Sequence, residues 1–432
     1  MDSIWARTEA LPSFGPLEGD LKTDVLIVGG GLAGLLCAYS LRRAGADCAL
    51  VEADRLCGGV TGRTTAKLTF QHGLIYHKLL QTFGPERARL YLEANRGALN
   101  RLRELCRDID CDFQERDSYV YALRDRRALD RELEALARLG FPAEFAETPA
   151  LPMPTAGAVR FPRQAQFHPL KFAAAIAKGL PIFEHTKVLE LGPGTAVTNR
   201  GTVRAERMVI ATHFPLLNKH GSFFLKLYQQ RSYVLALEHG PDVGGMYVDQ
   251  GEGGLSFRNA GGYLLLGGGG HRTGKRGGGW RELEDFARQH YPQAREAARW
   301  ATQDCMTLDG VPYVGRYSRR TEGLYVVTGF NKWGMTSSLA AAELLRDLLL
   351  GRGSPYEDLF SPSRSVFRPQ LAANAWESAL GLLTPTAPRC PHMGCALKYN
   401  AQEHSWDCPC HGSRFGEDGR LLDNPAADDK RM

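Results

Sequence analysis

The chain has 432 residues, of which 43% are hydrophobic and 23% charged, a composition typical of folded proteins with room for more than one domain. Its 53 basic and 48 acidic residues give a net charge of +5 without a long basic run, so we expect no nucleic-acid partner. No apolar stretch is long enough to span a membrane. Residues 1–21 lack the apolar core of a signal peptide, which predicts a cytoplasmic protein.

A βαβ unit is predicted near the N-terminus by its pattern of apolar residues. Val25–Val28 and Cys48–Val51 are apolar runs typical of buried parallel strands, and Leu32–Ala44 between them has helical periodicity. Gly45 follows the helix at the position where the backbone turns left-handed, a conformation that glycine adopts freely. The unit predicts a Rossmann-like α/β domain.

Three glycines in the first turn of this unit have the spacing of a dinucleotide-binding fingerprint. With that spacing, Gly29 makes the tight turn, Gly31 admits a pyrophosphate and Gly34 lets the helix pack on the strand. The helix N-terminus offers N–H groups to phosphate, and Glu52 is placed to accept hydrogen bonds from a ribose diol. FAD and NAD share this fingerprint, and its position near the N-terminus favours FAD.

The loop after Glu52 and a second glycine-bearing turn are expected beside the same cofactor. The loop places small hydroxyl groups where they can donate to phosphate or flavin. The later turn follows an apolar strand at 323–328 and opens a helix at 337–349, so it can hold the flavin oxygen whose charge grows on reduction. The residues expected to contact the cofactor from these regions, with one from a strand at 185–191, are Thr61, Arg63, Thr64, Thr65, Val188, Gly329, Phe330, Lys332, Gly334 and Met335.

The regions between these motifs alternate helices and strands. Helices are predicted at 85–106, 127–139 and 170–178, and strands at 118–123, 203–212, 229–238 and 256–266, the last interrupted by a hairpin turn at 260–262. The long strands indicate an antiparallel substrate domain inserted into the nucleotide domain. We expect FAD-binding parts at about 20–80, 150–215 and 300–350, substrate-domain parts at about 81–149 and 216–299, and a linker at 351–388 with one short helix.

Four of the ten cysteines lie in the last 43 residues and belong to a metal-binding pattern. Cys390-x-His392, followed after fifteen residues by Cys408-x-x-His411, supplies two thiolates and two imidazoles. Two thiolates on one iron and two imidazoles on the other describe a Rieske-type [2Fe–2S] cluster. The same ligands also suit a structural zinc ion, but the neighbouring Gly-Cys and Gly-Ser pairs favour the cluster. We predict this domain at 389–432.

These motifs resemble two known families. Gly29–Glu52, Asp309–Pro312 with Gly315, and Gly329–Gly334 resemble FAD-dependent amine and amino-acid oxidoreductases of the D-amino-acid oxidase superfamily. The C-terminal motif resembles a Rieske iron–sulfur domain, and a bacterial subfamily that combines both is similar over essentially the whole chain. The resemblance implies an α/β protein, α+β overall. Its parts are a Rossmann-like FAD-binding domain, an inserted antiparallel-sheet substrate domain and a shortened all-β Rieske domain, with FAD and a [2Fe–2S] cluster as cofactors.

The resemblance also suggests substrate-binding residues. In glycine-oxidase-like relatives a basic residue before the last helix binds the substrate carboxylate, and Lys332 occupies that place. Asp304 falls near a position where those relatives have a carboxylate-binding arginine, so an acid there favours a cationic, polyamine-like substrate. His72 and Arg258 are further candidates for the site.

The Rieske-like domain is shorter than usual, because few residues precede Cys390. Either the large domain supports the two ligand loops, or the cluster is more exposed and labile than usual. We expect the first, with the cluster lying against the large domain instead of swinging on residues 351–388. Cys395 and Cys410 correspond to a pair that forms a disulfide in some Rieske proteins, but a reducing cytosol argues against that bond here.

Two classes of function remain. The first is a flavin dehydrogenase that oxidises a C–N bond of an amine or amino acid and passes electrons singly through the cluster to an unknown acceptor. The second is a FAD/[2Fe–2S] electron-transfer or redox-sensing protein that binds no small-molecule substrate. Reduction of the flavin by an amine distinguishes the two classes.

Overall fold

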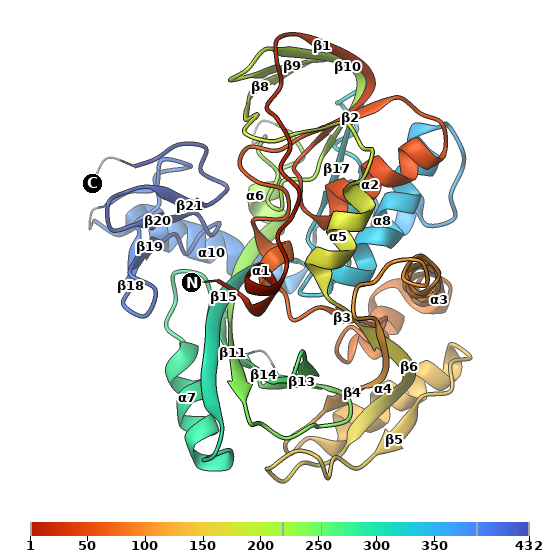
Figure 1. Ribbon diagram of the computed structural model, residues 1–432, viewed down its shortest axis with the longest axis vertical. Coiled ribbons are helices and arrows are strands. Elements are labelled where there is room, and N and C mark those ends of the chain that lie inside the picture. Colours follow the sequence, from red (N-terminus) through yellow and green to blue (C-terminus); the bar gives the residue numbers. More distant parts are fainter. Residues whose placement is uncertain (1, 218–219, 252, 386–387, 431–432) are drawn as a thin grey trace.

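The computed structural model describes residues 2–217, 220–251, 253–385 and 388–430. Within them the chain forms three β-sheets, with helices packed around the first two (Figure 1). A mostly parallel sheet and a larger second sheet make up the large domain, and a four-stranded sheet lies at its side in the C-terminal domain (residues 388–430).

The first sheet contains the predicted βαβ unit at its centre. β1 is flanked by parallel β10 and β2 in the order β16-β17-β10-β1-β2-β7, and Gly45 ends α2 with a φ of +83°. Dinucleotides bind at the carboxyl ends of such strands, where the order reverses. The strands are β1 (Leu21–Val28), β2 (Cys48–Val51), β7 (Ile182–Phe183), β8 (Val188–Gly192), β9 (Thr195–Thr198), β10 (Thr202–Ile210), β16 (Tyr313–Arg316) and β17 (Leu324–Thr328).

The second sheet has the order β15-β11-β14-β13-β12-β4-β6-β3, with β5 beside β6. Its pairs are antiparallel except β12 with β4, and the predicted hairpin joins β13 to β14. β3 and β6 belong to this sheet, although their residues fall in the ranges expected for the FAD-binding parts. Its strands are β3 (Lys67–Leu68), β4 (Gln114–Tyr121), β5 (Glu144–Ala146), β6 (Ala158–Gln166), β11 (Leu227–Glu238), β12 (Met246–Asp249), β13 (Ser256–Ala260), β14 (Tyr263–Arg272) and β15 (Arg295–Thr307).

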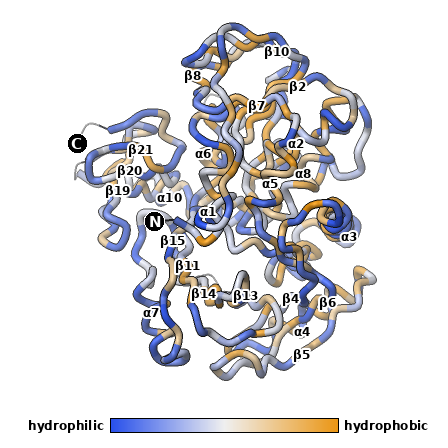
Figure 2. The backbone as a smooth tube through the Cα atoms, in the orientation of Figure 1, coloured by the Kyte–Doolittle hydropathy of each residue, from blue (hydrophilic) through white to orange (hydrophobic). Residues whose placement is uncertain are grey.

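The helices cover the first sheet and the outer faces of the second. α2 and α8 pack on each other over the first sheet, where hydrophobic residues are concentrated (Figure 2). α3 consists of two helical segments that meet at a kink, where Gly84 has a non-helical φ of +79°, and the second segment follows at Pro85, where the sequence predicts the start of a helix. The helices are α1 (Ile4–Thr8), α2 (Leu32–Arg43), the 3₁₀ turn η1 (Val60–Arg63), α3 (Ile75–Leu105), α4 (Arg126–Arg138), α5 (Pro169–Ala177), α6 (Phe223–Lys226), α7 (Gly279–His290), α8 (Gly334–Leu349), α9 (Glu357–Phe360) and α10 (Pro369–Leu383).

The C-terminal domain is a small antiparallel meander with the cysteine loops at one end. Cys390, Cys395, Cys408 and Cys410 pack with Phe415 in its core. The segment before it is fastened to the large domain, since Arg364 donates to both carboxylate oxygens of buried Asp309 at 2.8 Å. The strands of the meander are β18 (Lys398–Asn400), β19 (Ser405–Asp407), β20 (Arg414–Gly416) and β21 (Leu421–Asp423).

Candidate cofactor cavity and metal centre

A cavity of about 1320 Å³ lies between the first sheet and the second, and the C-terminal domain forms part of its wall. Most of the residues predicted from the sequence come together there. Gly34, Gly329 and Arg258 are not among the wall residues. The predicted residues that line the cavity are Gly29, Gly31, Glu52, Thr61, Arg63, Thr64, Thr65, His72, Val188, Asp304, Phe330, Lys332, Gly334 and Met335.

The three fingerprint glycines are needed for different reasons. Gly29 has a φ of +110°, and a Cβ there would lie 2.6 Å from the carbonyl oxygen of Ala211. A Cβ on Gly34 would overlap the carbonyl oxygen of Gly29. Within 4 Å, a Cβ on Gly31 would meet just one described protein atom, Thr61 Oγ1 at 3.6 Å, and Gly31 itself lines the cavity. Protein packing therefore explains Gly29 and Gly34, whereas Gly31 fits the close approach of a ligand.

Polar groups at the start of α2 and after β2 suit the phosphates and the ribose of an adenosine diphosphate. Gly31 caps the helix without a side chain, so the first N–H groups face the cavity, where Leu32 N donates to Thr61 Oγ1 at 3.0 Å. Glu52 accepts from Gly30 N at 2.6 Å and from Asp54 N at 2.9 Å. Burial raises the pKa of Glu52, and these hydrogen bonds oppose that rise. The helix end suits phosphate and the carboxylate suits a ribose diol.

The turn before α8 is held in an uncommon conformation. Asn331 and Lys332 have φ values of +51° and +73°, in the left-handed region that non-glycine residues rarely adopt. The Asn331 side chain maintains the turn, since its Nδ2 donates to Gly329 O at 2.7 Å and its Oδ1 accepts from Thr307 N at 2.8 Å. The turn places Lys332 in the cavity wall at the N-terminus of α8, and such maintained strain is typical of functional sites.

A half-buried acid faces the same part of the cavity as Lys332. Asp304, on β15, has its pKa raised by burial, and the nearby Lys332 is the strongest influence in the opposite direction. Ser232 Oγ donates to Asp304 Oδ2 at 3.5 Å. The cavity therefore presents one negative and one positive group close together.

His72 and Arg258 are engaged within the protein. The Nδ1 of His72 lies 2.7 Å from Tyr91 Oη and its Nε2 lies 2.9 Å from Thr69 O. Burial lowers its pKa to about 3, so the ring is neutral and stacks on Trp333 with centroids 5.2 Å apart. Arg258 was expected at the substrate site, but it lies behind the wall.

The guanidinium of Arg258 instead shapes the loop that lines the cavity. Its Nη1 donates to the carbonyl oxygens of Thr65 and Ala66, each at 2.7 Å. Lys67, two residues beyond Thr65, is a wall residue that the sequence argument passed over, and its Nζ donates to Thr65 Oγ1 at 3.1 Å. Burial, with a smaller effect from Arg258, lowers the pKa of Lys67 to about 7. Because lysine side chains are normally exposed, the residue type did not predict that Lys67 would be buried in the cavity wall.

The four predicted metal ligands converge at one end of the C-terminal domain. The thiols of Cys390 and Cys408 hydrogen-bond each other, and the rings of His392 and His411 have centroids 5.0 Å apart. Burial lowers the pKa of His392 to about 4 and that of His411 to about 3, so both imidazoles are in the neutral form that binds metals. This donor set fits a cluster with mixed thiolate and imidazole ligation.

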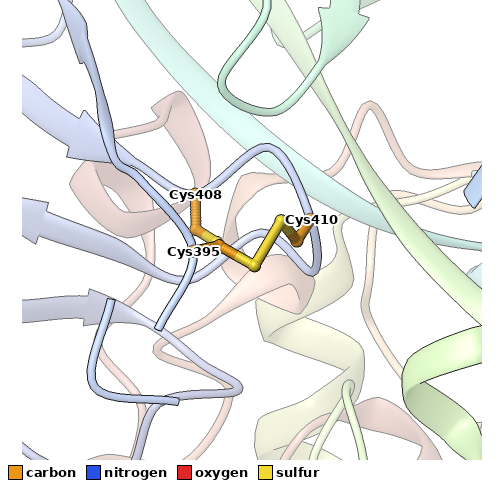
Figure 3. Close-up of side chains that lie close together, drawn as sticks. All are labelled: Cys395, Cys408 and Cys410. Atoms are coloured by element: carbon orange, nitrogen blue, oxygen red, sulfur yellow. A yellow bond between two sulfur atoms is a disulfide. The ribbon is translucent and has the colours of Figure 1, made fainter. Parts of the chain in front are cut away.

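A disulfide joins Cys395 to Cys410 and links the two ligand loops (Figure 3). The sequence left this bond open, with cytosolic reduction arguing against it, and the structure forms it because the folded loops bring the two side chains together. The sulfur atoms of this pair and of Cys408 lie within 4.8 Å of one another. The reducing potential of the cytosol favours free thiols in general, but it does not account for how close two particular sulfur atoms lie in the folded protein.

The large domain supports the ligand loops, as the shortened C-terminal domain requires. Gln229 Nε2 donates to His411 O at 3.1 Å, and Gln303 Nε2 donates to Gly412 O at 2.9 Å. Arg272 donates to the carbonyl oxygens of Pro409 and Cys410 at 3.1 and 3.2 Å. The expectation that the centre lies against the large domain is confirmed by these contacts.

A buried charge network fixes the C-terminal domain in place. Glu403 is 8% exposed and lies between Arg231 of β11 and Arg414 of β20. Arg231 Nε donates to Glu403 Oε1 at 3.0 Å, Arg414 Nη2 donates to Glu403 Oε2 at 2.9 Å, and Tyr233 Oη donates at 2.9 Å. Burial alone would raise the pKa of Glu403, but the two arginines outweigh it and lower the pKa to about 2.

A second contact brings the C-terminal domain into the cavity wall. Residues 420–427 line the cavity, and Asn424 Nδ2 donates to the carbonyl oxygens of Thr212 and Phe214 at 2.6 and 3.0 Å. This contact could not be predicted from the sequence, because nothing in the local pattern links residues 420–427 to a turn two hundred residues earlier. The two candidate sites therefore share a boundary.

A dinucleotide cradle and a Cys₂His₂ centre in one molecule define a redox protein of the flavin and iron–sulfur class. The family model described as FAD dependent oxidoreductase matches residues 24–348, and that of the Rieske [2Fe-2S] domain matches residues 375–431. The chain therefore belongs to the FAD-dependent oxidoreductase family of D-amino-acid oxidase type and carries a C-terminal Rieske [2Fe–2S] domain. FAD and a [2Fe–2S] cluster are its cofactors.

Known proteins are similar over most of the chain. The putative Rieske 2Fe-2S iron-sulfur protein YhfW of Bacillus subtilis (strain 168) is 32% identical, with 98% of this chain and 96% of that protein covered. Gamma-glutamylputrescine oxidoreductase of Escherichia coli (strain K12) is 24% identical over 80% of this chain and 87% of its own. The structure of glycine oxidase from Geobacillus kaustophilus has a TM-score of 0.68 at 22% identity, covering 80% of this chain and all (100%) of that one, which shows a shared fold.

None of the helices in the described part of the chain combines the length and the apolar character needed to cross a bilayer. The cytoplasmic location remains a prediction.

The geometry at Gly31 predicts that Gly31→Val gives folded protein without flavin. The φ of Gly31 is −72°, which valine tolerates, and the added side chain enters the space for the pyrophosphate. Flavin released by acid should fall roughly tenfold or more while the far-UV circular dichroism is kept. Gly34→Val is the control, and it should lose the fold because its side chain meets protein backbone. Full flavin content in folded Gly31→Val would place the cofactor elsewhere.

The charge network predicts that Glu403→Gln destabilises the C-terminal domain by about 3 kcal/mol near neutral pH. The pKa of Glu403 is lowered from 4.5 to about 2, so its stabilising effect is complete above about pH 4.5 and is lost as the pH falls towards 2. Urea unfolding followed by tryptophan fluorescence should therefore show a difference from the wild type that shrinks over this interval. Asp428→Asn, whose carboxylate is 85% exposed, is the control and should change little. A constant difference at all pH values would contradict the role of the ionised carboxylate.

Proposed function

We propose that this protein is an amine or amino-acid dehydrogenase whose electrons leave through the Rieske cluster. In the reaction, the substrate loses a hydride from carbon and a proton from nitrogen, which gives an imine and removes two electrons. Bound FAD supplies the two-electron acceptor, and the cluster supplies a one-electron carrier. The observation that carries the proposal is that the wall of one cavity holds the dinucleotide cradle, the Asp304–Lys332 pair and part of the Rieske domain.

The Asp304–Lys332 pair supports a substrate that carries an ammonium group. Asp304 is suited to bind the ammonium, and Lys332 is suited to bind the carboxylate of an amino acid. A polyamine-like substrate would use Asp304 alone. The names of similar proteins agree with this chemistry, since they include gamma-glutamylputrescine oxidoreductase, glycine oxidase and L-proline dehydrogenase.

Lys67 supports the proton transfer that amine oxidation needs. An ammonium must lose a proton before its carbon can give up a hydride, because the departing electrons need a neutral nitrogen to stabilise the product. With a pKa of about 7, Lys67 is present in both protonation states near neutral pH. It lies in the cavity wall and hydrogen-bonds Thr65, which holds it there.

A hydrogen-bonded path leads from the cavity wall to a cluster ligand. We assign Cys390 and Cys408 to one iron and His392 and His411 to the other. His213 lines the cavity, and its Nε2 lies 3.1 Å from Gln229 Oε1. Gln229 Nε2 in turn donates to His411 O at 3.1 Å. This short path supports electron transfer between the two cofactors.

The alternative, an electron-transfer or sensing protein without a small substrate, gives no role to the charged pair in the cavity. Asp304 is half-buried, and a carboxylate partly removed from water costs free energy, so binding of a cationic substrate is the use that justifies its place in the cavity wall opposite the exposed Lys332. The experiment that separates the two classes is anaerobic mixing with amines and amino acids, followed at the flavin bands. Reduction by a compound of either kind supports the dehydrogenase. Reduction by a protein partner alone, with every small molecule inactive, supports the alternative.

The Asp304–Lys332 pair predicts that two variants change the KM values of a diamine and an amino acid in different ways. Asp304→Asn should raise KM for a diamine about tenfold or more, because it removes a charge-assisted contact to the ammonium. Lys332→Met should raise KM for an amino acid and leave the diamine unaffected. Steady-state kinetics with both substrates measures this pattern. No shift for either substrate in Asp304→Asn, or equal shifts for the two substrates in Lys332→Met, would return the two residues to a structural role.

The path through Gln229 predicts that Gln229→Met slows reduction of the cluster without slowing reduction of the flavin. Gln303→Met is the matched control, since Gln303 also holds the Rieske loops but its side chain does not bond His213. Stopped-flow absorbance separates the two steps, and the EPR spectrum of the reduced protein should be of Rieske type in both variants. The wild type should contain two irons per chain. One zinc per chain in protein purified without oxygen would exclude the cluster as the electron outlet.

A further inference from the structure

Helix α10 carries an exposed apolar strip beside the cluster loops. Trp376 and Leu383 are 64% and 80% exposed, and Leu380 between them is exposed as well. Positions 376, 380 and 383 share one face of a helix. Leu382 and Met393 are exposed next to this face, and Figure 2 shows α10 as mostly hydrophobic. We call these five residues the α10 patch.

The α10 patch lies directly on the cluster-binding loops. Gly381 O accepts from Ala396 N at 2.9 Å, and a Cβ on Gly381 would lie 2.5 Å from Cys410 Sγ. Arg389 Nη1 donates to Leu382 O and to Gly394 O, each at 3.1 Å. The cluster is therefore bounded by the α10 patch on one side.

The other side of the centre faces the large domain. The ring of Phe214 is edge-on to His392 and His411, with centroids 6.2 and 6.3 Å away. The flavin cavity is on this side, since Phe214 follows the wall residues Thr212 and His213. The ligand loop between Cys390 and Cys395 reaches the surface at Met393, which is 41% exposed, so an electron that enters from the cavity side can leave the molecule there.

A basic groove adjoins the α10 patch. It has a volume of about 840 Å³, and its wall includes Leu380 together with the exposed cations Lys275, Arg276, Arg281 and Lys398. Glu377 is the one acid among its lining residues, and it pairs with Lys275 at 2.6 Å. Within the described ranges, the other three cations have no ion-pair partner. The groove therefore carries a net positive charge.

We propose that the α10 patch and this groove form the docking surface for the electron acceptor, a small acidic protein that carries one electron. The inference rests on the proposed function and identifies the chemical class of its acceptor. Each docked carrier takes one electron, so two carriers in succession remove the two electrons of one substrate. An aromatic centre surrounded by charge is the arrangement that gives protein interfaces affinity and fast association.

Other occupants fit this surface less well. A second copy of the chain would bring cations against cations, which costs affinity. A membrane-binding helix carries its basic residues along its own polar face. Here the cations come from the turn before α7, from α7 itself and from β18, and they line a concave groove. The surface is concave, basic and adjacent to the cluster loops. Its charge and position therefore suit an acidic protein that carries electrons.

The test measures binding of a plant-type [2Fe–2S] ferredoxin of net negative charge to the complete protein with both cofactors. Thermophoresis at low ionic strength should show binding that weakens as salt is added. Arg276→Glu/Lys398→Glu should weaken binding about tenfold or more. The matched control is Arg124→Glu/Arg127→Glu, which makes the same change in net charge on the substrate domain and should have less than about a threefold effect.

The apolar part is tested in the same way. Trp376→Ala should weaken binding about tenfold, as expected for a central aromatic contact, whereas Leu123→Ala, at a residue 49% exposed near α4, should not. Cytochrome c of net positive charge should bind less well than the ferredoxin. Stronger binding of cytochrome c, or equal effects of the two double variants, would overturn the proposal.

Two further outcomes would assign the surface to another occupant. A concentration-dependent dimer that Trp376→Ala disperses would overturn the proposal in favour of a second copy. Binding to phosphatidylglycerol vesicles that Trp376→Ala abolishes would overturn it in favour of a membrane. Binding is measured on oxidised protein without substrate, so it does not depend on amine oxidation. Intact flavin reduction by an amine without carrier docking would overturn this inference and leave the proposed function standing.

Discussion

The structure depends on one buried carboxylate that lies between two arginines. Glu403 connects Arg231 of the second sheet to Arg414 of the Rieske domain. A buried ion pair adds little net stability compared with apolar packing, because both charges must lose their water. It does make wrong arrangements costly, since any shift of the domain leaves a charge unpaired. The network therefore fixes the orientation of the Rieske domain more than it strengthens the contact.

Other contacts require that fixed orientation. The hydrogen bond from Gln229 to the backbone of His411 tolerates little movement, and neither does the insertion of Asn424 against the turn at Thr212. A Rieske domain with its full base strands holds its own ligand loops. Here the same task falls to side chains of β11, β14 and β15, so the second sheet serves both the substrate cavity and the cluster.

The sequence was most informative where a function depends on a short, local pattern. The glycine fingerprint and the Cys-x-His spacing each lie within a few residues, and physical rules for turns and ligands apply to them directly. Arg258 and Lys67 could not be placed in this way. Both are charged and both are buried, which follows from contacts between β13 and the loop before β3 that are far apart in the chain. The resemblance identified the Cys395–Cys410 pair, but whether that pair is oxidised depends on how close the folded loops bring the two sulfur atoms, which the sequence does not show.

The place of residues 420–427 in the cavity wall has a consequence for biogenesis. During synthesis the dinucleotide cradle and the second sheet emerge before this segment, so the cavity is complete only when the Rieske domain docks. FAD thus has an open route into the protein until the iron–sulfur domain folds over it. The order in which the two domains fold therefore sets the moment at which the cavity closes.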